Sequence, residues 1–98
     1  STQAKTLFPY TTLFRSGRVQ GVGYRQFACD TARLMRISGW VRNLPSGEVE
    51  AEAQADAEQL ADYERRLRRG PQLARVENLA AQDLPDEPGE TKLFEIRR

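Results

Sequence analysis

The chain has 98 residues, of which 39% are apolar and 30% charged, and its formal net charge is +1. These values are typical of one small globular domain with a single core, and they give no reason to expect binding to nucleic acid or to a membrane. One cysteine excludes an internal disulfide, and the lack of histidine removes the commonest general base and metal ligand. No apolar run reaches the roughly 18 residues of a membrane span, and no secretory leader pattern is present, so we expect a cytoplasmic protein.

The N-terminal part divides at Pro9. Residues 1–9 carry no periodic pattern and are expected to form a loose segment, whereas residues 10–98 are expected to form the one domain. Tyr10–Ser16 is rich in aromatic, β-branched and leucine residues, which predicts a strand. Strict alternation divides its side chains between two faces, neither of them cleanly apolar: Tyr10, Thr12 and Phe14 on one, and Thr11, Leu13 and Arg15 on the other.

A glycine-rich stretch follows, with the sequence GRVQGVGYR from Gly17 to Arg25. Glycine allows the backbone to approach a ligand closely or to take up a positive φ. A glycine loop before a helix N-terminus is a common anion site, because unpaired N–H groups point outward there. The same glycines also fit a tight strand-to-helix turn without any ligand, and the spacing alone favours neither interpretation.

The middle of the chain predicts a helix and a hairpin. Residues 24–35 have helical apolar spacing, and the residues expected on the apolar face are Tyr24, Phe27, Ala28, Thr31, Leu34 and Met35. Residues 38–43 predict a second strand, and residues 48–53 alternate charged and apolar residues like a half-buried antiparallel strand. Leu44, Pro45, Ser46 and Gly47 are typical of the turn between the two strands.

A second helix is predicted over residues 56–69, with Asp56 as N-cap, Gln59 in the capping-box position and Gly70-Pro71 as the stop. Its four late arginines, Arg65, Arg66, Arg68 and Arg69, are interpreted as a solvated last turn rather than an anion patch. Residues 73–82 predict a further strand with Ala74 and Val76 inward, residues 83–90 an acidic loop, and residues 91–97 a closing strand with Phe94 and Ile96 on one face.

The order β-α-β-β-α-β predicts an α+β fold of ferredoxin-like type, in which two helices cover one face of an antiparallel sheet. Within it, Arg25 directly follows the glycines, and its guanidinium carries five donors that match a tetrahedral oxyanion. Asn43 ends the second strand, where its amide can either start the turn or hold a water through donor and acceptor atoms.

Two motifs in this order resemble the acylphosphatase family: the stretch from Gly17 to Arg25, and the later GWVRN of residues 39–43 with GEVE of residues 47–50. The likeness covers roughly residues 17–97. It implies a ferredoxin-like fold and hydrolysis of the carboxyl–phosphate bond of small acyl phosphates. It further implies that the phosphate is held by the loop amides and by Arg25, and that Asn43 orients the attacking water. Carried over position by position, the loop residues are Gln20, Gly21, Val22, Gly23 and Tyr24.

The missing histidine agrees with this substrate class. An acyl phosphate expels a carboxylate whose conjugate acid has a pKa near 4, so the leaving group needs little help from a general acid. The expectation is therefore an enzyme without cofactor or metal, for which inorganic phosphate or sulfate competes as an anion. We expect a monomer that binds neither nucleic acid nor membrane.

Two positions depart from the family pattern. The family register of the first strand would point Arg15 into the core, where an unpaired polar group costs about 2–7 kcal/mol. Either the register shifts, or Arg15 reaches solvent or a partner, or the strand frays. The string of residues 8–16 is also similar to a translated sequencing adapter, which the upstream reading frame of the genomic locus would test. Arg36 replaces a glycine at the end of the first helix, and a left-handed conformation there costs roughly 1–2 kcal/mol.

Two other functions remain open. One is a phosphate-binding module of the same fold without turnover, which sulfate binding without hydrolysis would favour. The other is an RNA-binding domain, which the near-zero charge and the lack of an RNP motif make less favourable.

Overall fold

The structure is a computed structural model that describes residues 10–17, 19–20, 23–71, 75–76, 78–84 and 93–97. The expected loose segment 1–9 lies outside these residues. The elements in chain order are β1 (Tyr10–Ser16), β2 (Val19–Gln20), α1 (Tyr24–Leu34), β3 (Ser38–Asn43), β4 (Val49–Ala55), α2 (Ala57–Arg69), β5 (Arg75–Val76), β6 (Leu79–Leu84) and β7 (Glu95–Arg97). In the part of the chain described, no helix is long and apolar enough to cross a membrane.

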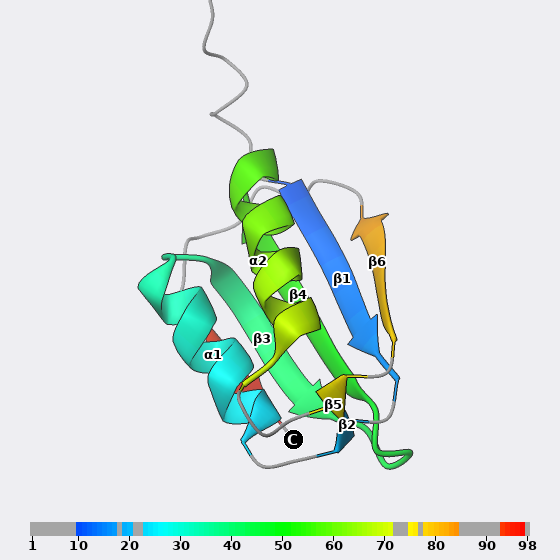
Figure 1. Ribbon diagram of the computed structural model, residues 1–98. Coiled ribbons are helices and arrows are strands. Elements are labelled where there is room, and N and C mark those ends of the chain that lie inside the picture. The colour runs from blue at the N-terminus through cyan, green and yellow to red at the C-terminus, as the bar shows by residue number, and fades with distance from the viewer. Residues whose placement is uncertain are drawn as a thin grey trace, which may run out of the picture.

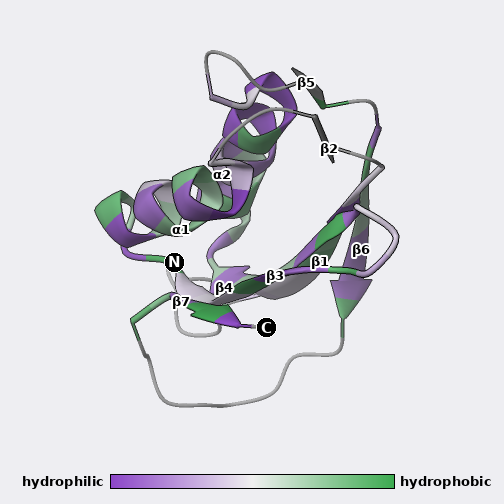
Figure 2. Ribbon diagram, turned by 90° about the horizontal axis from the view of Figure 1, so that it is seen from below, coloured by the Kyte–Doolittle hydropathy of each residue, from purple (hydrophilic) through white to green (hydrophobic). Residues whose placement is uncertain are grey.

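The main sheet has the strand order β6-β1-β4-β3-β7, and both helices lie on one of its faces (Figures 1 and 2). This confirms the ferredoxin-like α+β fold. The predicted antiparallel pairing holds from β6 to β3, whereas β7 runs parallel to β3, so the complete sheet is mixed. A separate pair, β2 and β5, lies beyond the end of the main sheet.

The register of β1 decides which of its side chains are buried. Phe14 lies opposite Ala51 of β4 and is 1% exposed, within the core. Arg15 therefore points to the helix-free face, where it forms an ion pair with Glu50. The family register that would bury Arg15 is wrong for this chain, because Phe14 is the larger apolar side chain and takes the core position. Of the alternatives above, the register shifts, and the Arg15 side chain, which is 52% exposed, reaches both solvent and a partner.

The core centres on Tyr63 of α2. Its ring contacts Phe14 and Phe94 edge-to-face at centroid distances of 5.7 and 6.1 Å, and its hydroxyl donates to the Ala28 carbonyl at 2.8 Å. Aromatic pairs of this geometry add to the stability that burial gives, and the hydrogen bond satisfies the buried hydroxyl. Tyr63 thereby links α1, α2 and the sheet.

The first helix runs as predicted, with differences at its end. Tyr24, Ala28 and Thr31 are buried as expected, but Leu34, expected on the apolar face, is 83% exposed. Leu34 lies at the margin of the apolar stripe in the last turn, and Cys29 and Ala32 fill the core instead. Arg36 adopts a left-handed φ of 59°, as its place after the helix implied.

The second helix begins at its predicted cap, because the Asp56 carboxylate accepts from the Gln59 backbone N–H at 2.8 Å. The side chain of Gln59 does not close a capping box; it donates to the Met35 carbonyl after α1. The late arginines Arg65, Arg66 and Arg68 pair with Asp62 or Glu64 one turn earlier and are exposed, which confirms the solvated turn.

The single strand predicted over residues 73–82 is two strands. β5 pairs with β2, and β6 pairs with β1 as far as Leu84, two residues into the predicted acidic loop. Val76 packs against the core, whereas Ala74 lies outside the described residues. The closing strand is shorter than predicted, and Phe94 and Ile96 face the core as expected.

Candidate active site

The predicted catalytic pair meets at one cavity. It lies where β3 ends and α1 begins, has a volume of about 420 Å³, and is lined by Gly23, Tyr24, Arg25, Gln26, Asn43, Leu44, Pro45, Gly47, Val49 and Ile96. A volume of this order is within the usual range for small-molecule sites and leaves room for more than a phosphate. Arg25 and Asn43, which are far apart in the sequence, thus share one hollow. Four of the seven predicted site residues line it.

Of the three remaining predicted site residues, the structure describes only the backbone of Gln20. The backbone of Gln20 belongs to β2, where it pairs with Arg75 of β5. Gly21 and Val22 lie outside the described residues. The short β2–β5 pair therefore marks where the chain enters the predicted phosphate loop.

The start of α1 is built around a left-handed glycine. Gly23 is the N-cap, with φ 79° and ψ 18°, and its carbonyl accepts from the Phe27 N–H at 2.8 Å. A Cβ on Gly23 would meet no heavy atom within 4 Å, so the positive φ rather than crowding requires glycine here. A glycine cap supplies no side chain to the first-turn N–H groups, which leaves them for an anion.

Tyr24 fixes the direction of this helix end. Its side chain is buried, and its hydroxyl donates to the Leu67 carbonyl of α2 at 2.9 Å. Burial raises the pKa of the Tyr24 hydroxyl, so this group is a neutral anchor. Arg25 follows directly in the first turn, half-buried, where a bound anion would offset the unfavourable placement of a cation.

Asn43 is held by the β3–β4 hairpin. It is exposed, is the last residue of β3, and lies opposite Val49 of β4. The turn after it is closed by two backbone bonds, Leu44 N–H to the Glu48 carbonyl at 2.8 Å and Gly47 N–H to the Leu44 carbonyl at 3.0 Å. Such a closed turn fixes the strand end and with it the base of the Asn43 side chain.

The charges of the cavity suit an anion with an apolar substituent. Arg25 is the one charged side chain among the described lining residues, while Leu44, Pro45, Val49 and Ile96 provide apolar wall. A helix N-terminus and a guanidinium on one side, and a side-chain amide on another, are the parts that phosphoryl transfer by positioning and charge stabilisation requires.

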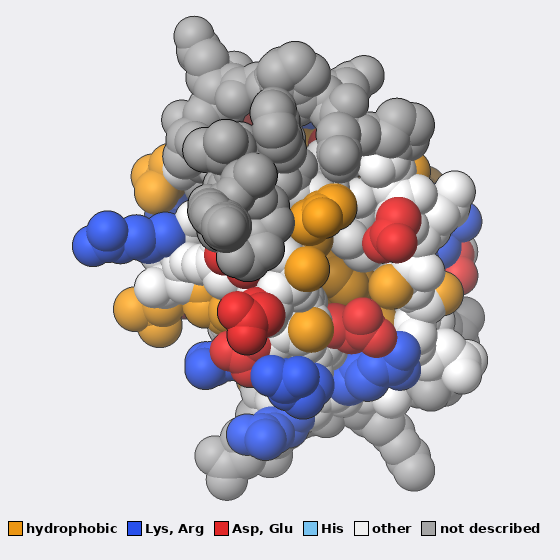
Figure 3. All heavy atoms as spheres, turned by 90° about the horizontal axis from the view of Figure 1, so that it is seen from above, with side chains coloured by type: hydrophobic (Ala, Val, Ile, Leu, Met, Phe, Trp, Pro, Cys, Tyr) orange, Lys and Arg blue, Asp and Glu red, His pale blue; other side chains and the backbone are white. Residues whose placement is uncertain are grey.

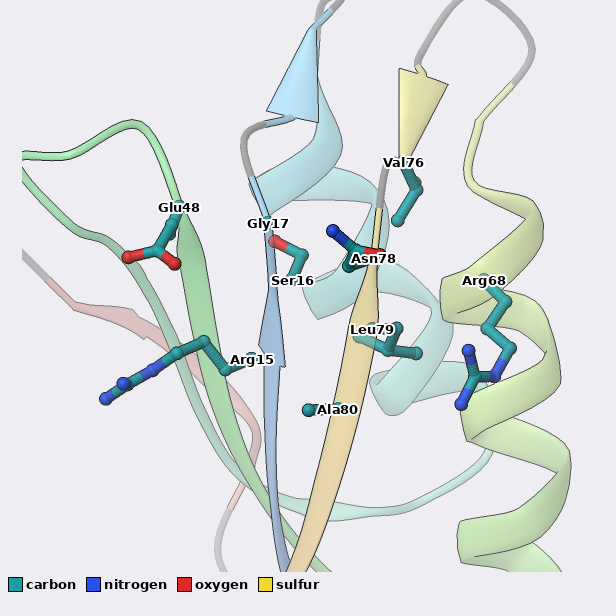
Figure 4. Close-up of a pocket in the computed structure, with 9 residues that line it drawn as sticks. All are labelled: Arg15, Ser16, Gly17, Glu48, Arg68, Val76, Asn78, Leu79 and Ala80. Atoms are coloured by element: carbon teal, nitrogen blue, oxygen red, sulfur yellow. The ribbon is translucent and has the colours of Figure 1, made fainter.

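A larger hollow of about 600 Å³ lies at the other end of the glycine stretch, around Gly17 and Asn78 (Figure 4). It contains none of the predicted site residues. Its two arginines are already paired, Arg15 with Glu50 and Arg68 with Glu64, and in the figure they extend to opposite sides of β1. This hollow is therefore the weaker candidate for an anion site.

Sequence reasoning missed the burial of Glu50. Alternation along residues 48–53 predicted an exposed carboxylate, yet Glu50 is 4% exposed between Arg15 and Arg42. Phe14 was the available signal: assigning it to the core turns Arg15 toward the charged positions of β4.

Acidic and basic side chains are intermixed on the molecule when it is viewed from the end where β1 and α2 begin (Figure 3). Among the described residues of this face, carboxylates lie beside the Lys and Arg side chains, so the basic charge there is offset locally.

Comparisons with known proteins converge on one family. A family model described as acylphosphatase matches residues 11–96. An acylphosphatase of Anaeromyxobacter dehalogenans is 44% identical over 82 residues, which cover 84% of this chain and 87% of the relative. One of Bordetella bronchiseptica is 48% identical over 66 residues, covering 67% and 70%.

Solved structures agree with these relatives. An acylphosphatase from Coxiella burnetii matches with a TM-score of 0.82 at 28% identity, covering 98% of this chain and 100% of that one. The Bacillus subtilis acylphosphatase matches with a TM-score of 0.80 at 26% identity, covering 92% and 99%.

Proposed function

The chain belongs to the acylphosphatase family of acyl phosphate hydrolases, and we propose that its active site is the cavity that holds Arg25 and Asn43. The observation that carries this proposal is that both side chains line one hollow, at the start of α1 and the end of β3. The substrates are small acyl phosphates, which are cleaved to a carboxylate and inorganic phosphate.

The phosphoryl group binds at the start of α1. The backbone N–H groups from Gln20 to Tyr24 surround its oxygens, and Arg25 donates to them through its guanidinium. The glycine cap and the positive end of the helix support this role, because charge that spreads over the phosphoryl oxygens in the transition state meets donors already in place.

Asn43 holds the attacking water. Its amide oxygen accepts a hydrogen bond from the water, while its amide N–H₂ can donate to the phosphate or to the water. The fixed hairpin beneath Asn43 supports this role, because placing a nucleophile in line is the main task that a protein performs in phosphoryl transfer.

The reaction proceeds without a metal. The carboxylate leaves unprotonated, so neither a general acid nor a Lewis acid is needed at the leaving oxygen. Activity on acetyl phosphate should therefore survive dialysis against a chelator, while alkyl phosphate esters should be poor substrates because their alkoxide leaving groups need protonation.

Turnover of acetyl phosphate and benzoyl phosphate tests the site. Arg25→Ala should lower kcat/KM by at least about 100-fold, because it removes a donor to the developing charge. Asn43→Ala should lower kcat by a similar factor, whereas the inhibition constant of phosphate should change less than kcat does. Arg65→Ala, which removes an exposed arginine of α2, is the matched control and should keep the parental rate.

Two results would contradict the proposal. Full activity in Asn43→Ala would exclude its role in holding water. Binding of sulfate by the parental protein without any hydrolysis would favour the alternative, a phosphate-binding module.

A further inference from the structure

A buried carboxylate bridges the strands next to the proposed active site. Glu50 Oε2 lies 2.6 Å from Arg15 Nη2, and Oε1 accepts from Arg42 Nη2 at 2.7 Å and Nε at 3.0 Å. The Glu50 side chain is 6% exposed, against 52% for Arg15 and 43% for Arg42. A charge so removed from water requires such partners, because an unpaired buried carboxylate is costly.

The bridge crosses three adjacent strands at one level. Cα pairing places Glu50 of β4 opposite Arg15 of β1 on one side and opposite Arg42 of β3 on the other. Figure 4 shows the Arg15 side chain extending from β1 on the side away from α2. The bridge therefore lies on the helix-free face and outside the cavity.

Arg42 and Glu50 are sequence neighbours of residues that line the proposed active site. Asn43 directly follows Arg42, and Val49, which lines the cavity, directly precedes Glu50. On the third strand, Arg15 lies just before Ser16 and Gly17, from which the chain continues to the phosphate loop.

Arg42 is held from a second direction. Its guanidinium lies 5.3 Å from the centroid of the Trp40 ring, and Arg97 of β7 lies at the same distance from that ring. Cation–π contact and the two bonds to one carboxylate oxygen leave Arg42 little freedom, and the strand end that carries Asn43 is correspondingly fixed.

We propose that Glu50 is a positioning residue for hydrolysis: by holding Arg42 and Arg15, it sets the end of β3 that carries Asn43 relative to the end of β1 that leads to the phosphate loop. This inference rests on the proposed function of Asn43. Glu50 touches no substrate, so its loss should misplace the water and leave phosphate binding to Arg25 and the loop intact.

The kcat of Glu50→Gln on benzoyl phosphate is the primary measurement. It should fall about tenfold or more, because small displacements of a positioned nucleophile have large kinetic effects. KM and the inhibition constant of phosphate should stay within about twofold, since ground-state binding is unchanged.

Glu52→Gln is the matched control. Glu52 lies two residues further along the same face of β4, between Leu13 and Trp40, and its substitution should leave kcat parental. Urea unfolding of both variants, with and without phosphate, verifies that the molecules assayed are folded. If Glu50→Gln does not fold, Arg42→Lys provides the same test, because lysine keeps the charge but loses the two-pronged contact.

The double variant Glu50→Gln/Asn43→Ala separates the two proposals. Its kcat should equal that of Asn43→Ala alone, because a misplaced strand end has no further effect once the amide is gone. A parental kcat in Glu50→Gln would overturn the positioning role while leaving the proposed function intact. Additive losses in the double variant would also overturn it, and a parental kcat in Asn43→Ala would overturn both proposals.

Discussion

Arg36 is a single residue in an unfavourable conformation. Its φ of 59° lies in the left-handed region directly after α1, a place that glycine fills at little steric cost. Arg36→Gly removes a backbone strain of roughly 1–2 kcal/mol. Glycine also raises the conformational entropy of the unfolded chain, which costs about 0.4–1 kcal/mol of stability. The variant should therefore be more stable by about 1 kcal/mol in urea unfolding.

Arg36→Ala is the control for that prediction. Alanine keeps the strain and loses only an exposed side chain, so its stability should remain close to that of the parent. Equal stability of the glycine and alanine variants would show that the left-handed conformation is not strained.

Residues differ in how far the sequence predicts them. Arg25 and Asn43 lie in short contiguous motifs, and each needs only its own strand or helix end to be placed. In the structure both residues line one cavity, and their roles there stay a prediction. The Arg15–Glu50 ion pair could be predicted only by knowing which side chain of β1 packs in the core. That choice is determined by contacts between strands that are distant in the sequence.

At the scale of elements, Ser16 joins β1 to β4 where their regular ladder ends. Its hydroxyl donates to the Val49 carbonyl at 3.3 Å and accepts from the Val49 N–H at 3.1 Å, and the side chain is buried. Ser16→Ala leaves both backbone groups without this partner and should destabilise the fold by about 1–3 kcal/mol. Thermal and urea unfolding measure the loss.

Ser46→Ala is the matched control, because its hydroxyl contacts only Glu48 in an exposed turn among the contacts described. It should change stability by less than about 0.5 kcal/mol. If both serine variants were equally stable, the Ser16 bridge would not be a determinant of the β1–β4 junction.

Element boundaries were predictable where local chemistry marks them. Asp56 and Gly70 delimit α2 because a cap and a stop act within one turn of the chain. The division into β5 and β6 and the parallel placement of β7 have no such local signal. β6 and β7 take the two edges of the main sheet left by β1 and β3, whereas β5 pairs with β2 outside that sheet.

At the scale of the whole molecule, the ionised Glu50 carboxylate contributes to the stability of the fold, and this contribution is lost at acid pH. The hydrogen bond from Arg15 lowers the pKa of Glu50 below its ordinary value of 4.5, and Arg42 acts in the same direction against burial. Because the pKa of Glu50 is lower in the folded protein than in the unfolded chain, its charge stabilises the fold at a pH above the unfolded pKa. This stabilisation is lost as the pH falls through the pKa of the folded state. Urea unfolding from about pH 6 to pH 3 should therefore show a shallower acid loss for Glu50→Gln than for the parent. If stability fell equally steeply with pH in both proteins, the contribution of the Glu50 charge would be contradicted.

Alkaline pH acts on the whole molecule through the two buried tyrosines. Burial raises the pKa of Tyr63 and of Tyr24 above the ordinary value of 10, and each hydroxyl donates to a backbone carbonyl. Above about pH 10 the tyrosines of the unfolded chain ionise, whereas the buried tyrosines of the folded protein stay protonated. The free energy of unfolding is therefore highest below about pH 10 and falls as the pH rises further. Each tyrosine should contribute a slope of about 1.4 kcal/mol per pH unit.

Tyr63→Phe should remove one of these two slopes. The variant loses about 1 kcal/mol at neutral pH with the hydrogen bond to Ala28, yet its stability should fall less steeply than that of the parent between about pH 10 and 11. Tyr10→Phe is the control, since it removes the hydroxyl of a tyrosine that is 45% exposed instead of one in the core. A parental slope in Tyr63→Phe would mean that ionisation of this core hydroxyl does not limit the alkaline stability of the fold.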